Sequence, residues 1–559
     1  GEILPTRGAE VCLRRDLAMN PVEANLYNRE GLPATAFRWS LPQDAEVLIA
    51  DVAARAGATN WRTMAYETQD GIRGGMLCAA WGLGKPQAVK IPLPVRGRYR
   101  IALGLAGTRM PMSEAPFGAL VRLARDPAPV FLDSPAPSRD AGWWFQPVEV
   151  EWKTAELDHD TLVVERPSNC RTGFCWVRLT PSGDAEPPRP KRHVVTNDAY
   201  HPYASMDELK APIMRFADSS VRAICYCVGN GPFTFASPSA VAPADLGDGA
   251  AHFENARAVE CARTYAWLRR EHPHLVDELA DFAHSVGLEF HVSFRTGCAL
   301  ELMRMDSVRN RAGSGEGLFA PENFCRLWDG TPVARLSYAS EEVQDFFLRF
   351  YAEQLTDKVD GICLIWIRAL PAMLFEQAFR ERFRKACGEE LAKPDDPRVV
   401  PLRKRVLTDF LRRVRKLAGR KRVSLVVPAR GELCESFGLD VPLLAREGLV
   451  DEFCLGDSLQ TARHDESFDY IDFAYFRRAL EGTSATYLPF LWRCDAAAAR
   501  KGMENGAAGA LLWDAGDKSW SDWRTLDAPE GRPPAPPTVH PLAKLDGFDA
   551  TSYPWHVAY

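Results

Sequence analysis

The sequence predicts an α/β protein in which a (β/α)8 TIM barrel follows an antiparallel β-sandwich domain. In the later part of the chain, strand-like apolar runs alternate with amphipathic stretches, and before it only short strand-like runs occur. A proline-rich charged stretch, PSGDAEPPRPKR at 181–192, separates the two parts and is typical of an extended linker. A chain of 559 residues is also too long for a single hydrophobic core.

These observations predict four segments. We expect a jelly-roll-like β-sandwich over residues 1–182, a linker over 183–192 and the barrel over 193–526. The last segment, 527–559, is too rich in proline for a helix, and we expect it to pack on the barrel or on the sandwich.

The first segment is predicted to form antiparallel strands, because its apolar runs are short and are separated by Gly, Pro, Asp and Asn. In GRYRIALGL the alternation places Tyr99, Ile101 and Leu103 on one face of a strand. Cys170 and Cys175 are close enough in sequence to form a disulfide across a turn, although spacing alone does not fix the geometry.

The barrel is predicted from eight strand-like runs, and their spacing over about 330 residues is typical of a TIM barrel with long loops. The expected strands are 193–198, 221–229, 288–295, 359–368, 422–429, 450–457, 485–493 and 507–516. We expect helices between these strands. In 340–355, for example, apolar residues from Val343 to Tyr351 recur on one helix face, and Ser340 is the expected cap at the start of the helix. An open doubly wound sheet is less favoured, because neither a GxGxxG motif after the first strand nor a P-loop occurs.

Composition excludes several classes of partner. A formal charge of −6 argues against nucleic acid, and no apolar run is long enough to span a membrane. Although the chain has 14 cysteines, it contains no CxxC motif and no zinc-like spacing, so we expect neither a metal nor a cofactor. The chain starts at GEILPTRG without Met, and we expect a secreted or periplasmic protein whose leader was removed, with a cytoplasmic location as the alternative.

Polar and aromatic side chains gather where the predicted strands end, and in a barrel these carboxyl ends open onto one face. Carboxylates and arginines bind sugar hydroxyls, and an indole ring packs against the C–H face of a sugar. Cleavage of a glycosidic bond needs two carboxylates. The candidate catalytic residues are Asp198, Glu432, Asp457 and Asp514. The candidate substrate-binding residues are Asn197, His201, Asn230, His291, Arg295, Trp366, Arg368, Arg430, Trp492, Arg493 and Trp513.

The barrel segment resembles the family-10-like glycosyl hydrolases, a group of bacterial (β/α)8 proteins, from about residue 190 to 515. The resemblance rests on the segments 276–295, 336–355, 359–368, 438–453 and 504–514, taken in order. It implies a glycan substrate and an accessory β-domain, which fits a role in polysaccharide degradation.

The fourth strand departs from the pattern of that group, DG-x-x-LD-[FY]-x-R. Here the string is DGICLIWIR, so Ile365 stands where the pattern has an aspartate. We therefore expect a glycosidase whose acids lie on other strands and whose substrate is a poly- or oligosaccharide, acidic or sulfated. The alternatives are a barrel that binds carbohydrate without hydrolysis and, less favoured, an isomerase or lyase that acts on a sugar.

Overall fold

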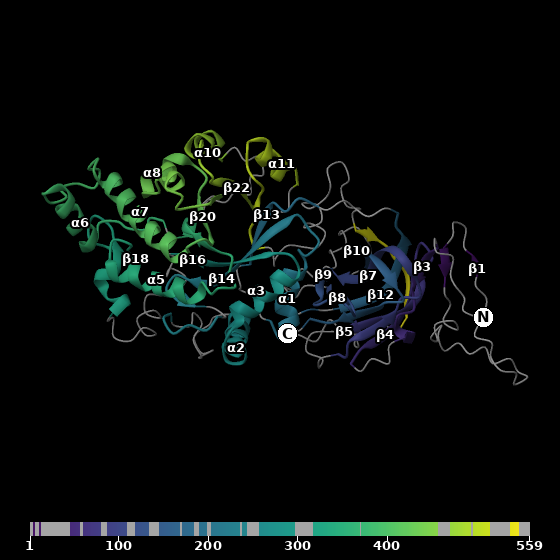
Figure 1. Ribbon diagram of the computed structural model, residues 1–559. Coiled ribbons are helices and arrows are strands. Elements are labelled where there is room, and N and C mark those ends of the chain that lie inside the picture. Colours follow the sequence, from purple (N-terminus) through teal and green to yellow (C-terminus); the bar gives the residue numbers. More distant parts are fainter. Residues whose placement is uncertain are drawn as a thin grey trace, which may run out of the picture. The chain divides into compact units, whose positions relative to one another are not determined.

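The computed structural model describes residues 4–5, 10–12, 45–55, 60–79, 86–108, 118–133, 145–167, 170, 172–183, 189–197, 203–234, 237–242, 256–296, 317–368, 370–456, 470–492, 496–514 and 537–546. The chain forms two compact units (Figure 1). The first comprises Gly1–Pro188, Tyr203–Arg215 and Ser519–Tyr559, and the second comprises Arg189–Pro202 and Phe216–Lys518.

The second unit is a closed barrel of parallel strands, which confirms the predicted fold class. Its strands pair in the order β13-β14-β16-β19-β20-β21-β22-β23, and β23 pairs with β13 to close the ring. Each strand falls inside a segment predicted from the sequence, except that β14 extends one residue beyond its segment, and β19 and β23 are shorter than predicted. The strands are β13 (His193–Asn197), β14 (Val221–Asn230), β16 (Glu289–Arg295), β19 (Gly361–Ile365), β20 (Arg422–Pro428), β21 (Glu452–Gly456), β22 (Thr486–Leu491) and β23 (Leu511–Leu512).

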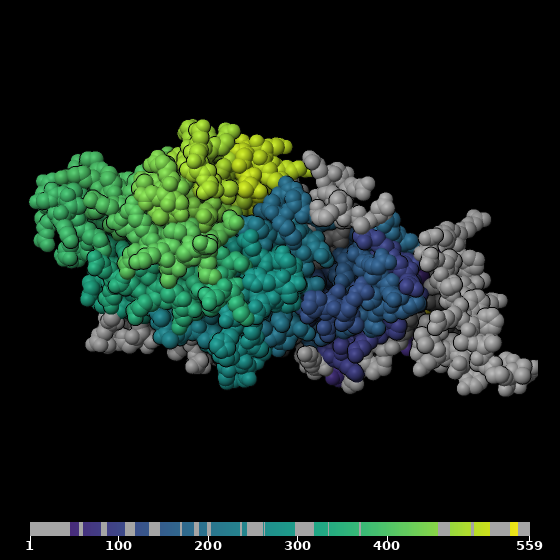
Figure 2. All heavy atoms as spheres, viewed as in Figure 1, coloured from purple at the N-terminus to yellow at the C-terminus, as the bar shows by residue number. Residues whose placement is uncertain are grey.

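Helices follow most of these strands and cover the barrel (Figure 1). They are α2 (Ala256–Glu271), α3 (Leu275–Ser285), α5 (Glu341–Gln354), α6 (Gln377–Cys387), α7 (Val399–Ala418), α8 (Gly431–Phe437), α9 (Val441–Arg446), α10 (Phe473–Leu480) and α11 (Ala496–Glu504). Short strands β15 (Phe233–Thr234), β17 (Phe324–Arg326) and β18 (Pro332–Leu336) lie in the connections. The segments coloured green form one continuous surface on the face that Figure 2 shows. None of the helices in the described part of the chain is both long and apolar enough to cross a membrane.

Helix α5 shows why the apolar period predicts this arrangement. Ser340 caps the helix by accepting a hydrogen bond from the Val343 N–H at 3.5 Å, and the predicted apolar face is buried. From β16, Phe294 points outward to this face and contacts the rings of Phe350 and Tyr351 at centroid distances of 5.1 and 4.5 Å. Because strand side chains alternate, Ser293 and Arg295 must point into the barrel.

The amino-terminal end of the barrel interior is closed by ion pairs. The register between β13 and β14 skips Arg222, since His193 pairs with Val221 and Val194 pairs with Ala223. The Arg222 guanidinium donates to Glu289 of β16 at 2.6 Å and to Glu452 of β21 at 2.8 Å. One arginine thus joins three strands of the barrel.

The first unit is built from two sheets, as predicted for a sandwich-like domain, and their strands pair antiparallel except β2 and β3, which pair in parallel. The larger sheet contains β1 (Leu4–Pro5), β2 (Glu10–Cys12), β3 (Glu46–Ile49), β4 (Arg62–Thr68), β5 (Arg73–Ala79), β7 (Arg96–Thr108), β10 (Phe145–Asp158), β12 (Thr172–Pro181), β24 (Thr538–Val539) and β25 (Leu542–Asp546). The smaller sheet contains β6 (Val89–Pro92), β8 (Gly118–Leu123), β9 (Val130–Asp133) and β11 (Thr161–Glu165). Helix α1 (Met206–Met214) belongs to the same unit.

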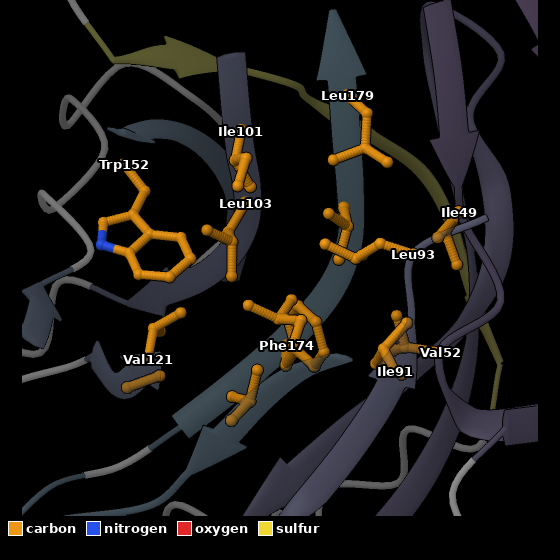
Figure 3. Packing of buried hydrophobic residues seen from close by; sticks show 14 of the residues in the cluster. Ile49, Val52, Ile91, Leu93, Ile101, Leu103, Val121, Trp152, Phe174 and Leu179 are labelled. Atoms are coloured by element: carbon orange, nitrogen blue, oxygen red, sulfur yellow. The ribbon is translucent and has the colours of Figure 1, made fainter. Parts of the chain in front are cut away.

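The main core of this unit lies between the two sheets (Figure 3). Ile101 and Leu103 of β7, which the alternation placed on one face, point into it, and Val121 of β8 faces them from the smaller sheet. Trp152 is 2% exposed and packs in this core, so it is a structural residue.

A close approach between two strands explains one glycine of β7. Gly104 pairs with Trp176 of β12, and a Cβ on Gly104 would lie 2.2 Å from the indole ring. The indole N–H of Trp176 donates to Glu149 at 2.8 Å. Cys170 and Cys175 form no disulfide, and the Cys170 thiol lies 3.7 Å from the Gly118 carbonyl oxygen.

The carboxyl-terminal segment adds two strands to the first unit. β24 pairs with β10, and β25 pairs with β4. Between them, His540 is 7% exposed, and its Nδ1 lies 2.7 Å from Asp70. Leu542 is 1% exposed in a second core with Met76, Trp176 and others. The last segment thus completes the sheet of the first unit.

Leu542→Ala should lower the free energy of unfolding of the first unit by about 2–5 kcal/mol, because it opens a cavity in the second core. Val539→Ala is the control, since Val539 of β24 is 39% exposed. This substitution should lower the free energy of unfolding by less than about 1 kcal/mol. Calorimetric unfolding of the full chain measures both. Equal effects of the two variants would show that the segment does not contribute to the core.

Candidate active site at the carboxyl ends of the barrel strands

Three aromatic rings lie together where β22 and β23 end. Phe490, Trp492 and Trp513 form this aromatic group, with ring centroids 5.0 Å (Phe490–Trp492), 5.2 Å (Phe490–Trp513) and 6.0 Å (Trp492–Trp513) apart. Trp513 is 3% exposed, whereas Trp492 is only half-buried. The half-buried indole is the member of the group that can present a surface to the C–H face of a sugar.

Asp514 follows this aromatic group directly and is half-buried. Its backbone has φ +47°, a left-handed conformation that is uncommon for residues other than glycine. Its N–H donates to the hydroxyl of Thr196 on β13 at 2.8 Å, which ties the end of β23 to the neighbouring strand. Residues held in such conformations cluster at functional sites, so Asp514 is the best placed of the candidate acids in the described part of the chain.

Glu432 and Arg430 are placed differently. Glu432 lies in the first turn of α8 with its side chain 79% exposed, and its carboxylate is 4.0 Å from the guanidinium of Arg430, which is 58% exposed. An exposed pair of this kind is solvated and contributes little to stability. Water is not excluded around Glu432, which disfavours it as the acid of a closed site.

Several candidates cannot be placed. Asp198, His201, Asp457 and Arg493 lie outside the described residues. The backbone of Arg368 ends a short 3-10 turn, Trp366–Arg368, after β19. The roles of these residues therefore stay predictions from the sequence.

Two of the predicted substrate-binding residues are brought together. Asn230 of β14 and Arg295 of β16 are direct neighbours in the register, and the Gly231 N–H donates to the Arg295 carbonyl oxygen at 2.7 Å. Arg295 is 5% exposed and lies on the inward face of β16. Asn197, in contrast, pairs with Tyr226, whose ring stacks on Phe290 on the outer face of the barrel strands.

His291 lies inside the barrel, away from the strand ends. Its ring is fully buried, with Nε2 3.1 Å from Glu289 and Nδ1 3.9 Å from the Cys225 sulfur. The ring packs against Gly361, and a Cβ added to Gly361 would lie 3.0 Å from the ring. A histidine without exposed surface is not available to a substrate, so the predicted binding role does not fit this position.

The protonation of His291 follows from these neighbours. Burial lowers its pKa, but the hydrogen bonds and charges of Cys225 and Glu289 outweigh burial and raise the pKa to about 9. Burial raises the pKa of Glu289. The hydrogen bond from His291 and the charge of Arg222 outweigh burial and lower the pKa of Glu289 to about 2. The pair is charged at neutral pH and forms part of the ion-pair network around Arg222.

Trp366 also departs from the prediction that it emerges at the functional face. It is fully buried, with its ring 4.9 Å from Tyr338 and 6.3 Å from Phe410 of α7. Strand alternation sends its side chain to the helix layer, because the preceding Ile365 points into the barrel. Trp366 is therefore a core residue.

Ile365 itself belongs to the apolar interior of the barrel. It is fully buried and packs in a cluster with Cys363, Val426 and Phe490 among others. The side chain at this position points toward the barrel axis, where the pattern of the resembling family has an aspartate. The fourth strand thus offers an apolar wall in place of a carboxylate.

Sequence reasoning missed Phe490 and Thr196. The period-two alternation of YLPFLW, which puts Leu488, Phe490 and Trp492 on one face, would have found Phe490. Nothing in the sequence indicates that Thr196 would meet Asp514. One further acid, Glu376, is 1% exposed, and burial raises its pKa. It accepts hydrogen bonds from the Ser337 hydroxyl and from the Leu374 N–H at 3.0 Å, so it joins two loops.

Among the described residues, no group of three or more His, Cys, Asp and Glu side chains has the geometry to hold a metal ion.

No family model matches the chain, and a search of curated proteins finds no match either. Solved structures that it resembles include TtGalA, an alpha-galactosidase from Thermus thermophilus, with 12% identity over 81% of this chain and 90% of that one and a TM-score of 0.32. A ruminal GH26 endo-beta-1,4-mannanase has 9% identity over 84% and 90%, with a TM-score of 0.31. Morphinone reductase has 14% identity over 58% and 82%, with a TM-score of 0.32. The similar structures thus include glycoside hydrolases and a reductase, and the function is argued below from the residues of the site.

Ile365→Asp should destabilise the barrel by more than about 3 kcal/mol at pH 8, because it buries a carboxylate among apolar side chains. The loss should be smaller at pH 5, where a buried carboxyl group takes up a proton. Ile365→Val, the control, should cost about 1 kcal/mol at both pH values. Chemical denaturation at the two pH values measures this, and a stable Ile365→Asp variant would contradict the apolar environment.

The Glu289–His291 pair should make barrel stability depend on pH in two windows. Because the pKa of His291 is raised, its contribution is complete below pH 6.5 and is lost as pH rises to about 9. Because the pKa of Glu289 is lowered, its contribution is complete above pH 4.5 and is lost as pH falls to about 2.

Glu289→Gln should make the melting temperature less dependent on pH in both ranges. Glu390→Gln, which changes a side chain that is 70% exposed, should leave the pH dependence as in the wild type. Thermal unfolding between pH 2 and 10 measures this. Identical pH profiles of the wild type and Glu289→Gln would refute the assignment.

Proposed function

We propose that this chain is a glycoside hydrolase whose active site lies at the carboxyl ends of the barrel strands. The observation that carries the proposal is the half-buried Trp492 of the aromatic group, with Asp514 at the end of the adjacent strand. An indole and a carboxylate at the ends of adjacent strands suit a sugar ring that stacks on one and is cleaved by the other. The resemblance to family-10-like glycosyl hydrolases agrees with this chemistry and is part of the proposal.

The proposed reaction uses two carboxylates. Asp514 protonates the leaving glycosidic oxygen, and Asp198 or Asp457, which follow β13 and β21 in the sequence, acts on the anomeric carbon or activates a water molecule. Glu432 has less support than Asp514 because its side chain is 79% exposed. The substrate would be a poly- or oligosaccharide, and the arginines Arg295, Arg368 and Arg493 favour one that carries carboxylate or sulfate groups.

A second function is favoured by Ile365. The fourth strand presents this buried apolar side chain toward the barrel axis, and an isoleucine neither transfers a proton nor attacks an anomeric carbon. A barrel that keeps the aromatic group but lacks hydrolysis would bind a glycan without cutting it. The two functions share the same binding surface and differ only in whether product is released.

Asp514→Asn should lower kcat by about 100-fold or more on any glycan that the wild type cleaves, because the amide cannot donate the proton. Asp395→Asn changes an acid whose side chain is 77% exposed and should leave kcat unchanged. The measurement is release of reducing sugar from neutral and acidic glycans.

Full activity of Asp514→Asn would remove this residue from the mechanism. Binding of a glycan by calorimetry without release of sugar from any substrate would instead support the non-hydrolytic function.

A further inference from the structure

Thr196 lies on the inward face of β13, close to the carboxyl end of that strand. Val194, two residues earlier, packs in the apolar cluster of the barrel interior. Because strand side chains alternate between two faces, Thr196 shares the inward face with Val194. Thr196 is 1% exposed, and a β-branched side chain has few rotamers to choose from. The strand therefore fixes where the Thr196 hydroxyl lies.

The end of β23 is bonded to the strands on both of its sides. β23 pairs with β13 up to Leu512. The next residue, Trp513, donates its N–H to the Leu491 carbonyl oxygen of β22 at 2.9 Å. The Asp514 N–H then donates to the Thr196 hydroxyl oxygen of β13 at 2.8 Å. This last bond is accepted by a side chain, so a single substitution removes it.

The backbone conformation of Asp514 supplies an independent observation. Its φ of +47° lies in the left-handed region, which residues other than glycine keep only where their surroundings impose it. The other non-glycine residues with positive φ in the described part of the chain, Asn60 and His159, are exposed, whereas Asp514 is half-buried. A return of Asp514 to an extended conformation would change the direction of its Cα–Cβ bond, and with it the direction of the carboxyl group.

We propose that Thr196 is the positioning residue of Asp514: its hydroxyl holds the backbone of the acid so that the carboxyl group is presented to the glycosidic oxygen. This inference rests on the proposed function and adds the residue that sets the geometry of the proton transfer. Because Thr196 is buried, it acts through Asp514 and does not touch the substrate. A misplacement of the acid by about 1 Å can lower the rate about 100-fold.

The test measures kcat and KM of the full chain on neutral and acidic glycans. Thr196→Val keeps the shape of the side chain and removes the acceptor, so kcat should fall about 10- to 100-fold while KM stays nearly unchanged. Thr196→Ser keeps the oxygen and should retain most of the wild-type kcat. Thr408→Val is the matched control and should leave kcat unchanged, because Thr408 of α7 is 2% exposed and its hydroxyl has no hydrogen-bond partner among the described residues.

Two further measurements separate positioning from a structural role. 4-Nitrophenyl glycosides of glucose, galactose, mannose and glucuronic acid have a leaving group that needs little protonation, so on these substrates Thr196→Val should lower kcat less than about threefold. In the Asp514→Asn variant the acid is already absent, and adding Thr196→Val should lower kcat no further. Equal losses on glycans and on nitrophenyl glycosides, or a further loss in the double variant, would overturn the inference. Thr196→Ala carries the same comparisons if Thr196→Val does not fold.

Hydrogen exchange in peptides that contain Asp514 tests the bond without a substrate. Exchange of these peptides should be faster in Thr196→Val than in the wild type and unchanged in Thr408→Val, and unchanged exchange in Thr196→Val would overturn the inference. If the wild type cleaves no glycan but exchange is faster in Thr196→Val, the proposed function fails while Thr196 still holds Asp514. If glycans are cleaved and Thr196→Val is as active as the wild type, the hydrolase stands and the positioning role is wrong.

Discussion

The barrel depends on the charge network that Arg222 makes inside its amino-terminal end. A guanidinium that is mostly withdrawn from water meets two carboxylates from strands on different sides of the ring, at 2.6 and 2.8 Å. Burial lowers the pKa of Arg222, but the charges of Glu452 and Glu289 outweigh burial and raise it. A buried charge that loses its partner is strongly destabilising, so these strands must keep their register for the charges to stay paired. The skipped position in the β13–β14 pairing delivers the arginine to this place, as bulges commonly re-aim a side chain.

The same network lies at the end of the barrel opposite to the proposed site. Charged groups at the amino-terminal end are bonded to each other, and Asp360, just before β19, accepts from His284 at 2.7 Å and from the Phe290 N–H at 2.8 Å. At the other end lie the half-buried Trp492, the left-handed Asp514 and the inward Arg295. The ion pairs and the proposed site thus lie at opposite ends of the same strands, as is usual in TIM barrels.

Ile365 makes the fourth strand apolar where it faces the barrel interior. The position lies at the level of Arg295, because Phe294 and Leu364 pair in the register between β16 and β19. An aspartate there would place a carboxylate at the level of the arginine, whereas isoleucine packs with Cys363, Val426 and Phe490. The fourth strand therefore contributes an apolar side chain, and not a charge, to the barrel interior at this level.

The sequence by itself determined the class of fold and the place of each barrel strand in the chain, because burial on both faces gives continuous apolar runs and helices repeat with their own period. It also determined that Asn230 and Arg295 end neighbouring strands. Only the tertiary structure decided which side chains face inward. It moved Trp366 to the helix layer and His291 to the ion-pair network, and it brought Thr196 to Asp514 across more than 300 residues of chain. A shift of one residue in a strand exchanges its faces, and the contacts that fix this choice come from distant segments that no local pattern encodes.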